Sequence, residues 1–233
     1  MSTTTRTDEL RAAAERAAAE LADAPARQAL EWVAQTFGDR WCIASNMQDA
    51  VLVHLAGTVR PGVDVLFLET GYHFAETIGT RDAVAAGYPV NVLDIRPQRT
   101  VPEQDDADGP RLYERDPARC CALRKVAPLA DALHSYDAWV TGVRRVEAPT
   151  RANTPVVTYD EHFGLVKVNP LAAWTDDDLT DYIERHHVLV NPLVAEGYPS
   201  IGCAPCTAKP LPGADLRSGR WAGLAKTECG LHG

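Results

Sequence analysis

Short apolar runs alternate with helical segments along the chain from Trp41 to about residue 143. The runs are WCIAS, VDVLFLE, VNVLDI and AWVTGV, and the segments among them include DAVLVHLAG and HFAETIGTRDAVAAG. Such alternation is typical of a parallel sheet that helices cover on both faces. A chain of 233 residues is long enough for one such domain and too short for two. We therefore expect a single α/β domain with a mainly parallel sheet.

The two ends of the chain differ from this pattern. Residues 8 to 36 are rich in alanine, with an amphipathic helical pattern that breaks at Pro25. We expect residues 1–39 to form a helical segment that packs on an α/β core of residues 40–200. After Pro199 the periodicity ends, and residues 201–233 hold three of the six cysteines among many glycines and prolines. This predicts an irregular, cysteine-rich tail held by ligands rather than by a core.

In parallel sheets, ligands bind in the crevice beyond the carboxyl ends of the strands. Three segments follow predicted strands and should line that crevice: SNMQDA (45–50), ETGYHF (69–74) and GVRRVEAPTR (142–151). Residues 99–118 are acidic and show no periodicity. We expect them to form a surface loop that leads to a helix carrying Cys120 and Cys121.

The charge balance limits the classes of partner. The 23 Lys and Arg against 32 Asp and Glu give a formal net charge of −9, which argues against a general nucleic-acid or membrane-surface binder. No apolar stretch is long enough to span a bilayer, and the N-terminal sequence lacks an apolar signal core. The expected location is the cytoplasm, where thiols stay reduced, so most of the cysteines are ligands or catalysts. Cys42, in a strand-like run, is the exception and is expected to be an inert core thiol.

Four thiols form two pairs far apart in the sequence: Cys120 with Cys121, and Cys203 with Cys206. Thiolates are soft ligands that suit zinc or iron–sulfur clusters. Side chains of adjacent residues diverge, which makes binding of one small ion awkward, whereas a cubane can accept them at separate iron atoms. This geometry favours a [4Fe–4S] cluster over zinc. The other readings are coincidental buried thiols with a redox CxxC, or a cysteine-rich module that only recognises a partner.

Cys229 is a further thiol on a glycine-flanked terminal segment, where core packing is poor. This placement suggests a nucleophile that moves, and an unused terminal thiol is the alternative. The nearby Lys226 and His232 favour its thiolate, while Glu228 opposes it.

The motifs CC with RK shortly after, GCAPC, ETGYHF, GVRRVEAPTR, KVNPLAAWTDDD and ECGLH occur together and in this order. In this set the chain resembles, over about residues 40 to 233, the assimilatory adenylylsulfate reductases, bacterial relatives of the phosphoadenylylsulfate reductases. The resemblance implies an adenine nucleotide alpha hydrolase-like fold, with residues 40–200 as the nucleotide-binding core and residues 201–233 as a cluster-binding and catalytic tail. It also implies one [4Fe–4S] cluster per chain, bound by Cys120, Cys121, Cys203 and Cys206.

The implied reaction reduces adenylylsulfate to sulfite and AMP through an S-sulfocysteine at Cys229, as a step of sulfate assimilation and cysteine biosynthesis. The implied reductant is thioredoxin or a similar dithiol. No nucleic-acid or membrane partner is expected, and the chain could form a homo-oligomer, although the sequence does not give the oligomeric state. Lys125, one helical turn after Cys121, could bridge cluster and substrate electrostatically. By the same resemblance His232 lies near the sulfate, and the substrate-binding residues are Ser45, Asp49, Glu69, Thr70, Gly71, Gly142, Arg144, Arg145, Arg151, Arg217, Arg220 and Lys125.

Two alternative activities are reduction of the 3′-phosphorylated nucleotide and ATP-dependent tRNA thiolation. Related ATP pyrophosphatases carry a Ser-Gly-Gly-x-Asp-Ser loop, and the loop here keeps Ser45 and Asp49 but loses both glycines. Because glycine-rich loops let backbone N–H groups close on several phosphates, the loss fits a ligand with one phosphate and one sulfate. The chain also has Glu69 where relatives have Asp, and Ala148 where many have Ser.

Overall fold

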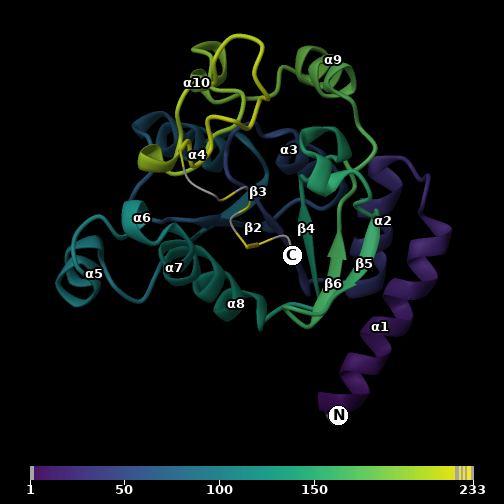
Figure 1. Cartoon of the computed structure of the whole chain (residues 1–233). Helices are drawn as coiled ribbons and strands as arrows, with labels where there is room; N and C mark the ends of the chain where they lie inside the picture. The colour runs from purple at the N-terminus through teal and green to yellow at the C-terminus, as the bar shows by residue number, and fades with distance from the viewer. Residues whose placement is uncertain (1–2, 224–225, 227, 229, 232–233) are drawn as a thin grey trace.

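The fold is built on one six-stranded sheet with the strand order β3-β2-β1-β4-β6-β5. The computed structural model describes residues 3–223, 226, 228 and 230–231 (Figure 1). All neighbouring strands are parallel except β5 and β6, which pair antiparallel. The strands are β1 (Trp41–Ala44), β2 (Val63–Leu68), β3 (Val90–Ile95), β4 (Ala138–Thr141), β5 (Val157–Asp160) and β6 (Leu165–Val168). The expected α/β architecture is confirmed, and the antiparallel hairpin β5–β6 is an addition to it.

Helices connect and cover the strands. The α-helices are α1 (Thr3–Glu20), α2 (Ala26–Phe37), α3 (Val51–Val59), α4 (Ala75–Gly87), α5 (Val101–Asp108), α6 (Leu112–Arg115), α7 (Pro117–Cys121), α8 (Ala127–Leu133), α9 (Asp176–His186) and α10 (Pro192–Ala195). A π-helical turn, η1 (Ala122–Val126), joins α7 to α8, and short 3₁₀ turns are η2 (Arg145–Glu147), η3 (Pro149–Arg151) and η4 (Ala204–Cys206). None of the helices in the described part of the chain has the length and apolar character needed to cross a membrane.

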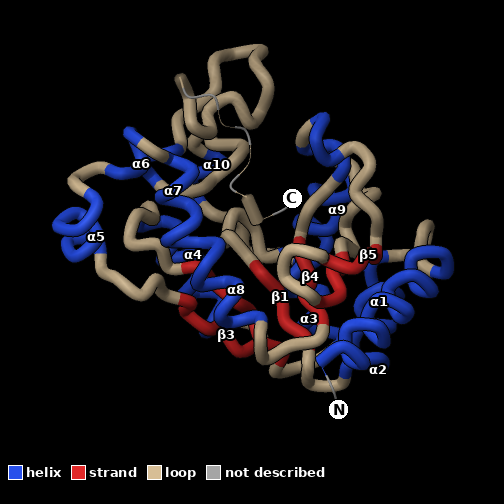
Figure 2. The backbone as a smooth tube through the Cα atoms, turned by 60° about the horizontal axis from the view of Figure 1, so that its bottom comes forward, coloured by secondary structure: helices blue, strands red, loops and turns tan. Residues whose placement is uncertain are grey.

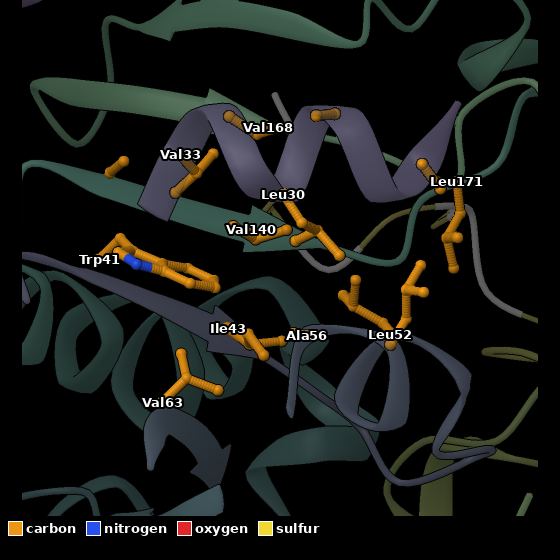
Figure 3. Close-up of a cluster of buried hydrophobic side chains, with 14 of the residues drawn as sticks. Leu30, Val33, Trp41, Ile43, Leu52, Ala56, Val63, Val140, Val168 and Leu171 are labelled. Atoms are coloured by element: carbon orange, nitrogen blue, oxygen red, sulfur yellow. The ribbon is translucent and has the colours of Figure 1, made fainter. Parts of the chain in front are cut away.

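The sheet separates two hydrophobic layers, because successive side chains of a strand point to opposite faces. Ile43 and Val140 pack in the larger layer with Leu30 of α2 and Ala56 of α3 (Figure 3). The intervening residues Cys42 and Trp139 belong to the other layer, with Leu129 and Leu133 of α8. Cys42 is fully buried there, which confirms the expectation of a core thiol.

The N-terminal segment forms two helices that separate at Pro25, as the pattern predicts. Helix α1 packs along the hairpin β5–β6. Figures 1 and 2 both show α1 and α2 at one side of the molecule and α5 to α7 at the other. The boundaries proposed at residues 39 and 200 stay a prediction.

The prediction of a surface loop over residues 99–118 is wrong, because this stretch forms α5 and α6 and the start of α7. Helix α5 begins with a capping box, in which Thr100 and Glu103 each accept a hydrogen bond from the other's backbone N–H. Pro102 at the start of the helix also favours this conformation. The signal is local capping rather than hydrophobic periodicity, since α5 buries little of its surface.

Candidate active site

The carboxyl ends of β1, β2 and β4 open into a cavity of about 240 Å³. This nucleotide-sized crevice, called the crevice below, lies where the strand order reverses between β1 and β4, as ligand sites do in open α/β sheets. Its apolar lining includes Phe67, Leu68, Trp139 and Leu171. Its lining also includes eight of the substrate-binding residues expected from the sequence, of which all but Ser45 and Gly142 are charged: Ser45, Asp49, Lys125, Gly142, Arg144, Arg151, Arg217 and Arg220.

The loop after β1 is held by side chains in place of the missing glycines. Ser45 Oγ accepts a hydrogen bond from the Met47 backbone N–H at 3.2 Å, and Met47 has a left-handed φ of 59°. Gln48 donates to the Pro199 carbonyl at 3.2 Å and accepts from the Ile201 N–H at 2.9 Å. Asp49 Oδ1 accepts a hydrogen bond at 3.0 Å from the backbone N–H of Val51, the first residue of α3. The loop is therefore fixed to the beginning of the C-terminal tail.

The loop after β2 contributes His73 to the crevice, whereas Glu69, Thr70 and Gly71 do not line it. Glu69 Oε1 accepts a hydrogen bond from the Gly71 N–H at 2.7 Å, so this carboxylate closes a local turn. Gly71 has a φ of 76°, and a Cβ there would lie 2.9 Å from Val101 and 3.2 Å from Arg124. Neither Glu69 nor Gly71 lines the crevice, and Thr70 lines the cysteine cavity described below.

The loop after β4 brings two of its three arginines into the crevice. Arg144 pairs with Asp176 at 2.9 Å, and Arg151 pairs with Glu147. Arg145 does not line the crevice, because its Nε donates to the Thr154 carbonyl at 2.9 Å and holds the loop itself. The sequence pattern GVRR could not distinguish these roles, since adjacent side chains differ only in direction.

The tail supplies further cations. Arg217 and Arg151 both pair with Glu228, at 3.2 and 2.9 Å. Burial raises the pKa of the Glu228 carboxyl, but the hydrogen bond and charge of Arg151 and the charge of Arg217 outweigh it, so the pKa is lowered. Arg220 donates to the Ile201 carbonyl at 3.1 Å and stacks on Trp221. Glu228 thus links Arg217 of the tail to Arg151 of the loop after β4.

A second cavity, the cysteine cavity, adjoins the crevice. Its lining contains all four paired cysteines together with Thr70, Tyr72, Tyr113, Pro117, Arg124, Lys125 and Trp221. Lys125 lines both cavities. The fold therefore brings the two distant cysteine pairs together, one at the junction of α7 and η1 and the other around η4.

The thiols in the cysteine cavity are largely shielded from water, and Cys120, Cys121 and Cys203 are buried. Burial, and then the neighbouring cysteines, raise the pKa of Cys120 to about 12, and burial and Cys203 raise the pKa of Cys206 to about 11. Thr70 Oγ lies 3.3 Å from Cys203 Sγ. The Tyr72 hydroxyl and the Trp221 indole N–H are buried without a hydrogen-bond partner in the described structure. These donors could satisfy sulfur acceptors of a group held by the four thiols.

The donor set fits an iron–sulfur cluster better than a single metal ion. Four thiolate sulfurs are the usual ligands of a [4Fe–4S] cluster, and hydrogen-bond donors around such a cluster adjust its reduction potential. Among the described residues, no group of three or more His, Cys, Asp or Glu side chains is arranged to hold one metal ion. Sulfurs that ligate separate corners of a cubane need not converge in this way.

Sequence reasoning missed several residues around both cavities. Arg124 is buried and lines the cysteine cavity, and its guanidinium donates hydrogen bonds to the Thr70 carbonyl and to Gln104 Oε1. Glu147 and Asp176 are the acidic partners of the crevice arginines. The RK after the cysteine pair was a signal for Arg124, whereas no sequence signal assigned partners to the arginines. Cys229 and His232 lie outside the described residues.

Comparison with known proteins gives a consistent picture. Residues 41–209 match the family model described as "Phosphoadenosine phosphosulfate reductase domain". A protein of Mycolicibacterium smegmatis named adenosine 5'-phosphosulfate reductase is 67% identical over 99% of this chain and 98% of its own length. Proteins of the same name from Mycobacteroides abscessus and Streptomyces coelicolor are 64% and 60% identical, over 99% and 97% of this chain and 97% and 96% of their own lengths.

Solved structures agree on the fold. A phosphoadenylyl-sulfate reductase from Candida auris, in a phosphate complex, aligns with a TM-score of 0.72 and 26% identity over 84% of this chain and 96% of that chain. An FMN adenylyltransferase from Candida glabrata aligns with a TM-score of 0.57 and 11% identity, over 85% of this chain and 75% of that chain. The latter likeness shows a shared fold and nothing more.

Proposed function

The chain belongs to the phosphoadenosine phosphosulfate reductase family, and on this premise we propose that it reduces adenylylsulfate to sulfite and AMP in sulfate assimilation and cysteine biosynthesis. One observation carries the proposal: a cation-lined crevice shares Lys125 with a cavity that contains four cysteines. The relatives named adenosine 5'-phosphosulfate reductase favour the unphosphorylated nucleotide over its 3′-phosphorylated form. The loop after β1, without glycines, makes the third activity, ATP-dependent thiolation of tRNA, the least suitable.

The chemistry is nucleophilic transfer of a sulfonate group. The Cys229 thiolate attacks the sulfate sulfur, the bond from sulfur to the bridging oxygen breaks, and AMP leaves with that electron pair. The protein then carries Cys229 as S-sulfocysteine. A dithiol reductant of the thioredoxin class attacks Cys229 Sγ and releases sulfite, and its second thiol closes a disulfide. The two electrons that reduce the sulfur come from this dithiol.

The crevice cations bind and orient the two anionic groups. Arginine suits this task because its planar guanidinium donates two parallel hydrogen bonds to an oxyanion. Arg151 and Arg217 pair with Glu228, the residue directly before Cys229 in the chain. These arginines therefore serve both the anion site and the segment that carries the proposed nucleophile. His232, also from the ECGLH motif, is assigned to the sulfate by the resemblance alone.

Cys120, Cys121, Cys203 and Cys206 would hold one [4Fe–4S] cluster per chain. When bound, the cluster would have a structural and electrostatic role rather than supply electrons, because the dithiol already provides the two electrons that the reaction needs. Lys125, which lines both cavities, would link the two sites electrostatically. We further propose a cytoplasmic location, where dithiol reductants keep thiols reduced.

A mass measurement tests the proposed nucleophile. Protein purified without oxygen and incubated with adenylylsulfate, in the absence of reductant, should gain about 80 Da at Cys229, the mass of SO₃. Cys229→Ser should keep its iron and form no adduct, whereas Cys203→Ser should lose iron first. An active wild-type protein that forms no adduct would instead indicate direct attack by the reductant.

A further inference from the structure

The carboxylate of Glu228 joins two segments of the crevice that are far apart in the chain. Its Oε1 accepts a hydrogen bond from Arg151 Nε at 3.0 Å, and its Oε2 accepts one from Arg151 Nη2 at 2.9 Å. Arg217 Nη2 donates to the same Oε2 at 3.2 Å, and Thr150 Oγ1 donates to Oε1 at 3.4 Å. Thr150 and Arg151 belong to the loop after β4, whereas Arg217 belongs to the tail. Glu228 is therefore attached to both sides of this junction.

These contacts differ from those of a surface ion pair. The side chains of Arg151, Arg217 and Glu228 are only 12%, 16% and 20% exposed. The two parallel bonds from Arg151 form the bidentate geometry in which arginine binds a carboxylate most strongly. A neutral amide in place of the carboxylate would leave two poorly hydrated guanidinium groups with less charge compensation. The charge of Glu228 is therefore needed to keep this junction together.

The part of the tail that carries Arg217 is a loop closed at its base. The Ala208 N–H donates to the Gly219 carbonyl at 2.8 Å, and the Trp221 N–H donates to the Cys206 carbonyl at 3.0 Å. A Cβ on Gly219 would lie 1.9 Å from the Ala208 carbonyl oxygen, so the two arms of the loop approach as closely as only glycine allows. Arg217 thus holds Glu228 from a closed loop whose base lies at the cysteine cavity, because Cys206 and Trp221 both line that cavity.

Glu228 directly precedes Cys229 in the sequence. Because successive Cα atoms are about 3.8 Å apart, an anchored residue limits how far its neighbour can travel. We propose that Glu228 is a positioning residue, whose pairing with Arg151 and Arg217 holds the chain so that the next residue attacks from within the crevice. This inference rests on the proposed function, in which Cys229 is the nucleophile. Glu228 acts through its neighbour, since orientation of the nucleophile lowers the entropy cost of the attack.

Single-turnover formation of S-sulfocysteine tests the anchor. The iron-loaded full chain is mixed with saturating adenylylsulfate without reductant, and the gain of about 80 Da is followed in time by mass spectrometry. Glu228→Gln keeps the size of the side chain, removes its charge and should slow adduct formation at least about tenfold. Glu228→Asp keeps the charge but draws the carboxylate back by one methylene, and its rate should fall between the two.

Glu196→Gln is the matched control, because Glu196 is exposed and forms no ion pair with any described residue. Its rate should equal that of wild type. Two further measurements distinguish positioning from a general structural effect. Release of the anchor should expose the terminal thiol, so Cys229 in Glu228→Gln should react with iodoacetamide at least about threefold faster, as located by peptide mapping. AMP affinity, from calorimetry, should be kept or tightened, since the variant removes a negative charge beside two crevice arginines.

The outcomes separate this inference from the proposed function. A wild type that forms the adduct together with an unchanged rate in Glu228→Gln would overturn this inference alone. Slower adduct formation with proportionally weaker AMP binding would also overturn it, because Glu228 would then shape the crevice for any ligand. Slower alkylation of Cys229 in the variant would assign the effect to thiol reactivity instead of position. An active wild type that forms no adduct would overturn the proposed nucleophile as well.

Discussion

Gly71 lies where the loop after β2 passes between α5 and the buried Arg124. Its φ of 76° is in the left-handed region, and a Cβ would lie 2.9 Å from Val101 Cγ2 and 3.2 Å from Arg124 Nη2. Gly71→Ala should therefore lower the free energy of unfolding by about 2–4 kcal/mol, from backbone strain and overpacking together. Urea denaturation with a fitted midpoint and slope measures the change.

Gly62→Ala separates the two contributions to this cost. Gly62 has a similar φ of 82°, but a Cβ there meets no atom within 4 Å. Its substitution should cost only the strain, about 1–2 kcal/mol. Equal losses in the two variants would mean that Val101 and Arg124 move aside freely.

At the scale of elements, Asp137 ties helix α1 to the sheet. It precedes β4 and accepts a hydrogen bond from Arg6 Nε of α1 at 2.7 Å and one from Arg40 Nη2 at 3.2 Å. Burial raises the pKa of Asp137, but the hydrogen bonds and charges of Arg40 and Arg6 outweigh burial and lower it below 3.8. Both arginines are half exposed, so solvent screens part of this energy.

Asp137→Asn should lower the free energy of unfolding at pH 7 by about 1–2 kcal/mol. Because the folded-state pKa is depressed, the stabilisation is present above the unfolded pKa and is lost as the pH falls through the folded value. The difference between wild type and variant should therefore shrink below about pH 4. Asp39→Asn is the control, since Asp39 pairs with Arg60 in an exposed position and should cost less than about 0.5 kcal/mol. If the difference in unfolding free energy between wild type and Asp137→Asn did not change with pH, the loss would come from packing rather than from the carboxylate charge.

At the scale of the whole molecule, the crevice exists only in the folded chain, because loops after three strands and the start of the tail form it together. A ligand that binds only the folded state stabilises it by mass action, by about 2.7 kcal/mol at a concentration 100 times its dissociation constant. For a domain of this size AMP should then raise the melting temperature by about 5–10 °C. Thermal unfolding monitored by circular dichroism checks this. Sodium sulfate at equal ionic strength should raise it less, and an equal effect would indicate only general anion binding.

Much of the fold was predictable from the sequence, because strand and helix patterns are local. The runs that became β1 to β4 were identified by their apolar content, and Pro25 marked the break between α1 and α2. The stretch that forms α5 and α6 was mispredicted, since α5 depends on the capping box of Thr100 and Glu103 rather than on an apolar face. The hairpin β5–β6 was missed, because its strands are only four residues long and the helix that it packs against, α1, is far away in the chain.

The sequence by itself determined the chemical inventory of the site: which thiols, arginines and carboxylates are available, and which follow a strand. Only the tertiary structure decided how they are used. Arg144 enters the crevice while Arg145 bonds the Thr154 carbonyl, although the two are adjacent in the chain. Glu69 closes its own turn instead of reaching the crevice. The physical reason is that the energy of a charged group depends on its burial and its nearest partners, and those partners come from segments that only the folded chain brings together.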